Sequence, residues 1–146
     1  MEKTLLMIKP EGMKHKNDII DMVKQVGLRI VWTNKIIATI TFLRKLYKDQ
    51  SGRFWEANKD YLVGKECLLI IVEGERSASR LYYLCGTHYD PNQCERGTIR
   101  RQFGEREPKV GANGQILFLN AVHRSTPENA EYETNLCYKL YVENLL

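Results

Sequence analysis

The apolar residues of the chain form two patterns, short runs and helical repeats, and the runs predict four β-strands. Three of the runs are short and bounded by turn residues, which is typical of strands buried in a sheet. The remaining one is longer, rich in β-branched residues, and partly alternates between apolar and polar positions. In chain order the predicted strands are Thr4–Ile8, Leu28–Ile40, Cys67–Val72 and Ile116–Val122.

Between these runs, apolar residues recur at helical spacing after residues that commonly cap helices. The first predicted helix is capped by Asn17 or Asp18 and stops at Gly27. The other predicted helices run from a cap at Thr41 to Tyr47, from about Arg53 to Leu62, from a cap at Ser77 to Gly86, and from Thr126 to about Cys137.

A long stretch from Thr87 to about Gln115 lacks periodicity and is rich in glycine and proline. Loops of more than about 12–15 residues are usually functional or disordered. The resulting element order is β, α, β, αα, β, α, long loop, β, α, without a repeat or a linker. This order predicts one domain over residues 1–146, an α+β sandwich with a four-stranded antiparallel sheet and helices on one face. The simplest match is the ferredoxin-like β-α-β-β-α-β arrangement.

Composition excludes several classes of protein without identifying one. Of the 146 residues, 43% are hydrophobic and 27% are charged, as in ordinary globular domains. No apolar run approaches the roughly 20 residues that cross a bilayer, and no signal-peptide pattern is present, so we expect a cytoplasmic protein without a membrane partner. The four cysteines form no C-x-x-C pair, which favours reduced thiols over a zinc site.

The net charge of +4 fits a polyanionic ligand and a solvated basic surface equally well. Its distribution is more informative, because basic residues crowd into one stretch between Cys94 and Ser125. Packed together, such charges repel one another unless an anion or carboxylates compensate them. The basic residues of this stretch are Arg96, Arg100, Arg101, Arg106, Lys109 and Arg124.

His123 is the first candidate for chemistry, since it follows a predicted buried strand and precedes a turn into a helix. A histidine at a strand end opens toward a loop edge, and neutral imidazole is a competent nucleophile near pH 7. Asn120, a polar residue within an apolar run, lies three positions before it. A lone histidine is also compatible with a purely structural role.

Three further features are compatible with phosphate or nucleotide binding, and each has a simpler structural explanation. Lys9 lies where the first strand ends, in the turn Lys9-Pro10-Glu11-Gly12, and could reach a phosphate or lie in solvent. Gly97-Thr98 opens a short helix, and its N–H groups and the nearby Arg100 could bind phosphate or form surface ion pairs. Aromatic residues such as Phe54 could stack on a base or pack in the core.

Taken together, these segments resemble the nucleoside diphosphate kinase family from Thr4 to about Tyr138. The matching segments occur in the order that the family shows. They are TLLMIKPEG, LYKDQSGRFW, VEG, RGTIRRQFG and NAVHRSTPENAEYE.

The resemblance implies a phosphotransferase that moves the terminal phosphoryl group of a nucleoside triphosphate to a nucleoside diphosphate. The mechanism would be ping-pong, through a phosphohistidine at His123 that Ser125 and Glu133 support. Lys9 would act on the transferred phosphoryl and also bind nucleotide. The other nucleotide-binding residues implied are Tyr47, Phe54, Thr87, Arg100 and Asn120.

The same resemblance implies that Mg²⁺ enters bridging the nucleotide phosphates, with no metal site built by the protein. It also implies a homo-oligomer, with a hexamer as the expected form. Nucleic acid is not an expected partner, because the aromatic residues lie mostly on predicted helices and no RNP1 pattern occurs. A nucleotide-binding regulatory module of the same fold with little turnover is the alternative function.

The chain departs from the family pattern at several positions. Tyr82 occupies the position of an arginine, and Arg124 replaces the glycine that follows the active histidine. Thr87 is only an approximate equivalent of the family threonine, and the loop after Arg100 is longer by about ten residues. Arg124 could supply the missing charge or form a surface ion pair with Glu128 or Glu131.

Overall fold

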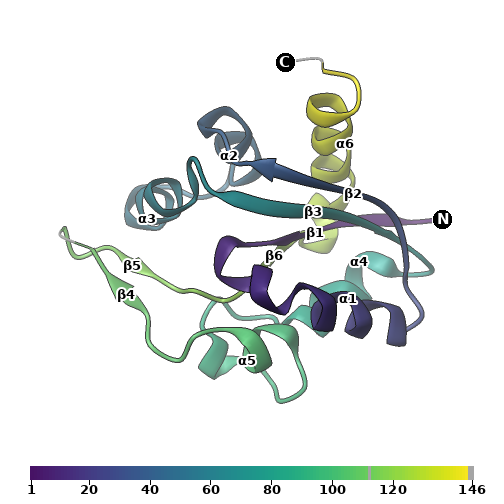
Figure 1. The fold of residues 1–146 in the computed structure, drawn as a ribbon, viewed down its shortest axis with the longest axis horizontal. Helices are drawn as coiled ribbons and strands as arrows, with labels where there is room; N and C mark the ends of the chain where they lie inside the picture. Colours follow the sequence, from purple (N-terminus) through teal and green to yellow (C-terminus); the bar gives the residue numbers. More distant parts are fainter. Residues whose placement is uncertain (112, 145–146) are drawn as a thin grey trace.

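The computed structural model describes residues 1–111 and 113–144, and a four-stranded sheet forms its centre (Figure 1). The strand order is β2-β3-β1-β6, and all neighbouring strands are antiparallel. This order confirms the predicted ferredoxin-like sheet. The strands are β1 (Lys3–Ile8), β2 (Arg29–Ile37), β3 (Glu66–Glu73) and β6 (Val122–Arg124).

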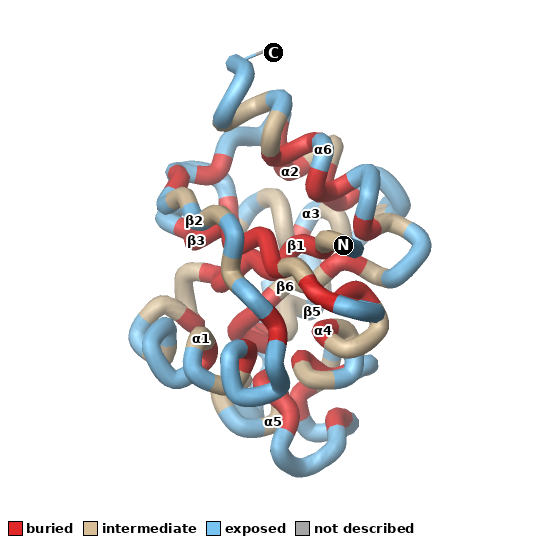
Figure 2. Tube along the Cα trace, turned by 90° about the vertical axis from the view of Figure 1, so that its right-hand side faces the viewer, coloured by how far each residue is buried: buried red, intermediate tan, exposed pale blue. Residues whose placement is uncertain are grey.

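The two central strands, β1 and β3, are apolar on both faces. In β1, Leu5 and Met7 belong to one core cluster, and Leu6 and Ile8 belong to another on the opposite face. Alternate side chains of a strand point to opposite faces, so a continuous apolar run needs cover on both sides. Figure 2 shows the buried positions concentrated along these strands.

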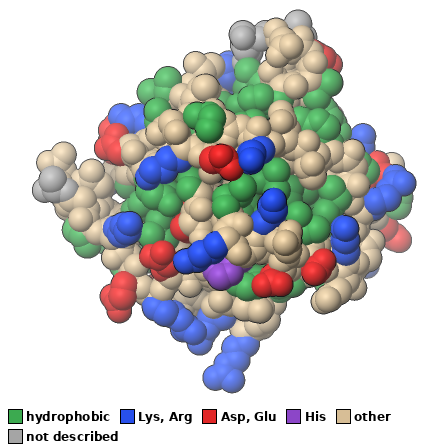
Figure 3. Space-filling model, viewed as in Figure 1, with side chains coloured by type: hydrophobic (Ala, Val, Ile, Leu, Met, Phe, Trp, Pro, Cys, Tyr) green, Lys and Arg blue, Asp and Glu red, His purple; other side chains and the backbone are tan. Residues whose placement is uncertain are grey.

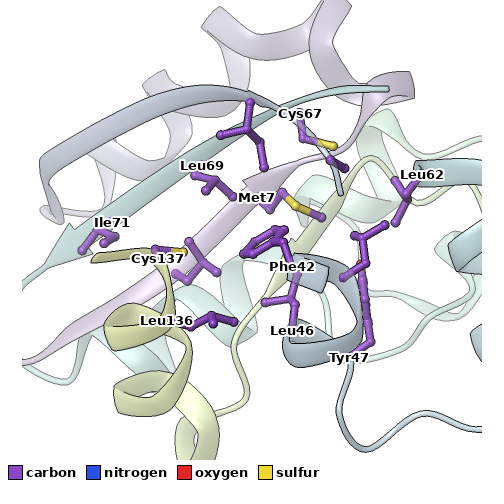
Figure 4. Close-up of a cluster of buried hydrophobic side chains, with 14 residues drawn as sticks. Met7, Phe42, Leu46, Tyr47, Leu62, Cys67, Leu69, Ile71, Leu136 and Cys137 are labelled. Carbon is purple, nitrogen blue, oxygen red and sulfur yellow. The ribbon is translucent and has the colours of Figure 1, made fainter. Parts of the chain in front are cut away.

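Helices accordingly cover both faces of the sheet. The predicted arrangement, with helices on one face, is therefore wrong in this respect. Figure 4 shows sheet residues such as Met7 and Leu69 facing Phe42 and Leu136. One face carries α1 (Lys16–Gln25), α4 (Ser77–Cys85) and α5 (Ile99–Phe103), and the other carries α2 (Ile40–Leu46), α3 (Gly52–Leu62) and α6 (Ala130–Tyr141).

Several helix starts differ from the predicted caps. A 3₁₀ turn, η1 (Pro10–His15), leads directly into α1, so neither Asn17 nor Asp18 caps that helix. Helix α2 is capped by Thr39, whose hydroxyl accepts the Phe42 N–H, and not by Thr41. Short 3₁₀ turns also form at Pro91–Gln93 (η2) and Pro127–Asn129 (η3).

The strand predicted over Ile116–Val122 is broken into two parts. Its first part, β5 (Ile116–Leu117), pairs with β4 (Lys109–Val110) in a hairpin that projects from the sheet (Figure 1). Only the last residue of the predicted strand, Val122, belongs to the central sheet, as the first residue of β6, which continues to Arg124. Ala121, just before β6, has a φ of 73°, a left-handed conformation that interrupts an extended strand. Within the described residues, no helix is long and apolar enough to span a bilayer.

Candidate active site

A cavity of about 570 Å³ opens where β1 ends and β6 begins, flanked by the α2–α3 segment and by β5. Ser125 is absent from its lining and lies behind His123 and Glu133. The other residues predicted for the site all line this cavity, and they are Lys9, Tyr47, Phe54, Thr87, Arg100, Asn120, His123 and Glu133. The structure thus brings together residues that are up to 124 positions apart in the chain (133 − 9).

His123 is held in one orientation from two sides. It lies in β6 opposite Met7 of β1, and its Nε2 is 2.7 Å from Oε1 of Glu133. The Ser125 hydroxyl donates to the same oxygen at 2.8 Å, which fixes the carboxylate. The Tyr47 ring meets the imidazole edge-on, with centroids 5.1 Å apart. Since Glu133 accepts the Nε2 proton of a neutral imidazole, the lone pair belongs to Nδ1.

Lys9 is a buried cation held by three oxygen atoms. Its Nζ donates to Oδ1 of Asn120 at 3.0 Å and to the Phe118 carbonyl at 3.4 Å, and it lies 3.6 Å from Oε2 of Glu11. Burial lowers the pKa of the Lys9 ammonium below its ordinary value, and the nearby Glu11 carboxylate opposes this shift. Asn120 in turn donates to the Tyr89 carbonyl at 2.9 Å, so its amide orientation is set.

Glu11 contacts Lys9 from outside the cavity lining, and the sequence analysis assigned it no role. Its carboxylate accepts the Ala121 N–H at 3.1 Å and the Tyr61 hydroxyl at 3.0 Å, in addition to pairing with Lys9. Its side chain is 6% exposed. The available signal was its position in the Lys-Pro-Glu-Gly turn, where an acid beside a lysine can pair with it.

Arg100 points into the site from α5. Its Nε and one Nη donate to the Val122 carbonyl at 3.3 and 3.0 Å, and its other Nη donates to the His88 carbonyl at 3.0 Å. Burial, and to a smaller extent the charge of Arg124, lowers the pKa of Arg100 to about 10. The guanidinium therefore remains charged at neutral pH, next to the strand that carries His123.

Three aromatic residues, Phe54, Tyr89 and Phe118, line the outer part of the cavity. Phe54 on α3 is 52% exposed, and its ring centroid is 5.9 Å from that of Tyr89. Tyr89 also lies 5.0 Å from Phe118, centroid to centroid. Tyr89 and Phe118 were missed because one lies in an aperiodic stretch and the other in a run interpreted as a buried strand. The rings leave exposed π surface that can stack on a planar ligand.

The site thus combines a fixed imidazole with two buried cations and exposed aromatic faces. Such an arrangement can stabilise negative charge that develops on a group transferred to or from His123. Within residues 1–111 and 113–144, no cluster of three His, Cys, Asp or Glu residues could hold a metal ion.

Comparison with known proteins identifies close relatives along nearly the whole chain. The family model for nucleoside diphosphate kinase matches residues 2–141. A nucleoside diphosphate kinase of Thermococcus kodakarensis is 30% identical over 143 residues, which cover 95% of this chain and 78% of that protein. One from Nitratiruptor sp. is 31% identical over 145 residues, covering 91% of this chain and 92% of that protein.

Among solved structures, the fold resembles that of a nucleoside diphosphate kinase from Borrelia burgdorferi. That structure is described as a transition state mimic with bound vanadate and ADP. It superposes with a TM-score of 0.81 at 26% sequence identity, and the match covers 92% of this chain and 85% of that one.

The Lys9–Glu11 pair generates a prediction about pH and stability. Replacing Glu11 by Gln preserves the size of the side chain and one acceptor oxygen, but it turns the other oxygen into an NH2 donor and leaves the buried ammonium without its carboxylate. We expect the free energy of unfolding to fall by about 3 kcal/mol at pH 7, as when a buried ion pair loses one partner. The folded-state pKa of Lys9 is already depressed and should fall further.

In the variant, the folded chain binds fewer protons at Lys9 than the unfolded chain does, so its stability rises with pH. The deficit in unfolding free energy relative to the wild type should therefore shrink as the pH rises toward the unfolded lysine pKa of about 10.4. Urea unfolding of both proteins at pH 7 and pH 10 measures this. Glu56→Gln, which breaks an exposed pair with Lys59, is the control and should leave stability unchanged. An equal loss at both pH values would contradict the assigned role of Lys9.

Proposed function

Because the chain belongs to the nucleoside diphosphate kinase family, we propose that it transfers the terminal phosphoryl group of a nucleoside triphosphate to a nucleoside diphosphate through a phosphohistidine at His123. Phosphotransfer between nucleotides is the reaction of the family. The observation that supports His123 as the intermediate is its geometry. Glu133 holds Nε2 at 2.7 Å, and the ring lines a cavity that two buried cations share.

In the first half of the reaction, the Nδ1 lone pair attacks the terminal phosphorus of the triphosphate. A P–N bond forms while the bond from this phosphorus to the bridging oxygen breaks, and the diphosphate leaves with the electron pair. In the second half, a terminal oxygen of another diphosphate attacks the same phosphorus, and the P–N bond electrons return to Nδ1. The Nε2 proton stays hydrogen-bonded to Glu133, so neither half requires a general base.

Lys9 and Arg100 stabilise the charge that spreads over the transferred group in the transition state. Both are held by oxygen atoms of the protein before any ligand binds, so little reorganisation is needed during transfer. Burial raises the pKa of Tyr47, which therefore keeps its hydroxyl proton and can donate to a phosphate oxygen. Asn120 and Thr87 provide neutral donors for the ribose and phosphates.

Mg²⁺ would be bound by the nucleotide phosphates, whose hard oxygen donors are the ligands that it prefers, and it would neutralise part of their charge.

The four cysteines are free and buried, which supports a reducing compartment and hence the proposed cytoplasmic location.

The alternative is a nucleotide-binding regulatory module with little turnover, and the replacement of a family arginine by Tyr82 favours it. A regulatory module needs a binding cavity but no nucleophile. Here the imidazole is oriented by a carboxylate that is itself fixed by Ser125, and binding alone does not require that chain of contacts. An RNA-binding role has less support, since acidic and basic side chains are interspersed on the face shown in Figure 3.

We expect His123→Ala to abolish both self-phosphorylation and nucleotide transfer while the fold remains intact. The protein is incubated with γ-labelled ATP and Mg²⁺, and the label on the protein is tested for acid lability and base stability, as for phosphohistidine. His15→Ala is the control, because His15 stacks on Phe103 and does not line the cavity. Acid-labile label on the His123→Ala protein would exclude this residue as the intermediate.

Little selectivity for the base is expected, because Phe54 and Tyr89 offer ring faces and stacking on a ring does not depend on base edges. Specificity constants for competing diphosphates should agree within about tenfold, or 1.4 kcal/mol. Competition assays with purine and pyrimidine diphosphates measure this, and a hundredfold preference for one base would refute it.

We also propose a homo-oligomer, with a hexamer as the expected form, on the basis of the family resemblance. The edge strand β2 supports association, since it carries exposed Val31 and Ile37. The long β4–β5 hairpin leaves a dimer or tetramer as alternatives. Light scattering at micromolar concentration should show a multiple of the 17.0 kDa chain, and a monomer would count against the proposal.

A further inference from the structure

Arg124 lines the cavity immediately after His123, and two contacts fix its guanidinium. Its Nε and one Nη donate to the Gly86 carbonyl at 3.3 and 3.1 Å. Its Cζ lies 4.3 Å from the centre of the Tyr82 ring, in cation–π contact. Tyr82 lies in the last turn of α4, and Gly86 directly follows that helix. Helix α4 in turn packs against β6, the strand that carries Arg124.

No carboxylate neutralises this guanidinium within the described part of the chain. Glu128 and Glu131 were the candidates, but neither forms an ion pair with Arg124 in residues 1–111 and 113–144. The charge of Arg124 instead acts on Arg100, and this repulsion contributes to the lowered pKa of Arg100. Two guanidinium groups thus line one cavity, and neither has a carboxylate partner among the described residues. An anion would stabilise such a setting.

We infer that Arg124 binds the phosphates of the nucleotide and that Tyr82 positions it. The inference rests on the proposed function and adds a residue to it. The Nη atom of Arg124 that does not contact Gly86 supplies two N–H donors, for which the described residues provide no acceptor. A nucleoside diphosphate has phosphate oxygens of matching charge, and these can accept both donors.

The inference also accounts for two unusual residues together. Tyr82 replaces an arginine of the family pattern and cannot supply its charge, but its ring supports an arginine from the neighbouring strand. Arg80, the nearest basic residue on α4, does not compensate, because it donates to the Val26 and Glu75 carbonyls and does not line the cavity. The phosphate-binding guanidinium has therefore moved from α4 to β6.

Calorimetric titration with ADP and with adenosine tests this inference. Arg124→Ala should weaken ADP binding by about ten- to thirtyfold, the effect of losing a charge-assisted hydrogen bond. Adenosine affinity should change by less than about twofold, because adenosine has no phosphate to lose a contact. Arg80→Ala is the matched control, since it removes an arginine held by carbonyl oxygens outside the cavity, and it should bind ADP as the wild type does.

A second set of variants tests whether Tyr82 positions Arg124. Tyr82→Phe keeps the ring and should retain ADP affinity, whereas Tyr82→Leu should lose part of it. In the Arg124→Ala background, Tyr82→Leu should have no further effect on ADP, because the two residues act through one contact. Circular dichroism of each variant checks the fold, and Arg124→Gln, which keeps two donors without charge, replaces the alanine variant if that one does not fold.

The outcomes separate the inference from the proposed function. If the wild type binds ADP and Arg124→Ala binds it equally well, Arg124 does not bind phosphate and the inference fails alone. If the adenosine affinity falls as much as the ADP affinity, the effect is structural and the inference also fails. If the wild type does not bind ADP at all, the inference and the proposed function fail together.

Discussion

The turn after β1 is locked to the backbone just before β6, and the rest of the site depends on this contact. The Lys9 N–H donates to the Ala121 carbonyl at 2.9 Å, and the Ala121 N–H donates to the Glu11 carboxylate at 3.1 Å. Gly12 fits here because an added Cβ would lie 2.4 Å from the Ala121 oxygen. Ala121 itself has a φ of 73°, a conformation that costs an alanine of order 1–3 kcal/mol and that its surroundings must offset.

This contact explains how residues at the two ends of the sequence meet. The kink at Ala121 turns Asn120 toward Lys9 and starts β6 in register with β1, which places His123 opposite Met7. The cations and the imidazole are then held by backbone and by paired side chains before a nucleotide arrives. Preorganised charge of this kind lowers the barrier to phosphoryl transfer, because the protein does not have to rearrange as charge develops.

The sequence predicted the parts of this structure that depend on local patterns. The apolar runs of β1 and β3, the ferredoxin-like order and the approximate helix ranges followed from periodicity, and the motif resemblance indicated the residues that line the cavity. The break before β6 was not predictable, because nothing in a run such as ILFLNAV signals a left-handed alanine. The presence of helices on both faces of the sheet was also not predicted, although the uninterrupted apolar runs of β1 and β3 require both faces to be covered.

Roles that arise only from tertiary contacts were also beyond the sequence. Glu11 pairs with Lys9 and the Ala121 N–H, but its role depends on a segment 110 residues away. Tyr89 belongs to the aromatic lining because its ring packs against Phe118 and Phe54, which are distant in the sequence. Two roles of Arg124 are equally compatible with the sequence, because tertiary packing decides whether its side chain reaches Glu128 or Glu131.

The most direct test of the account is a chase of the phosphorylated enzyme. The wild-type protein is labelled with γ-labelled ATP, freed of nucleotide, and then mixed with unlabelled CDP and Mg²⁺. If His123 carries the phosphoryl group between two half-reactions, the label should leave the protein and appear in CTP in equal amount. Label that stays on the protein, or that is released as inorganic phosphate with no CTP formed, would contradict the proposed mechanism.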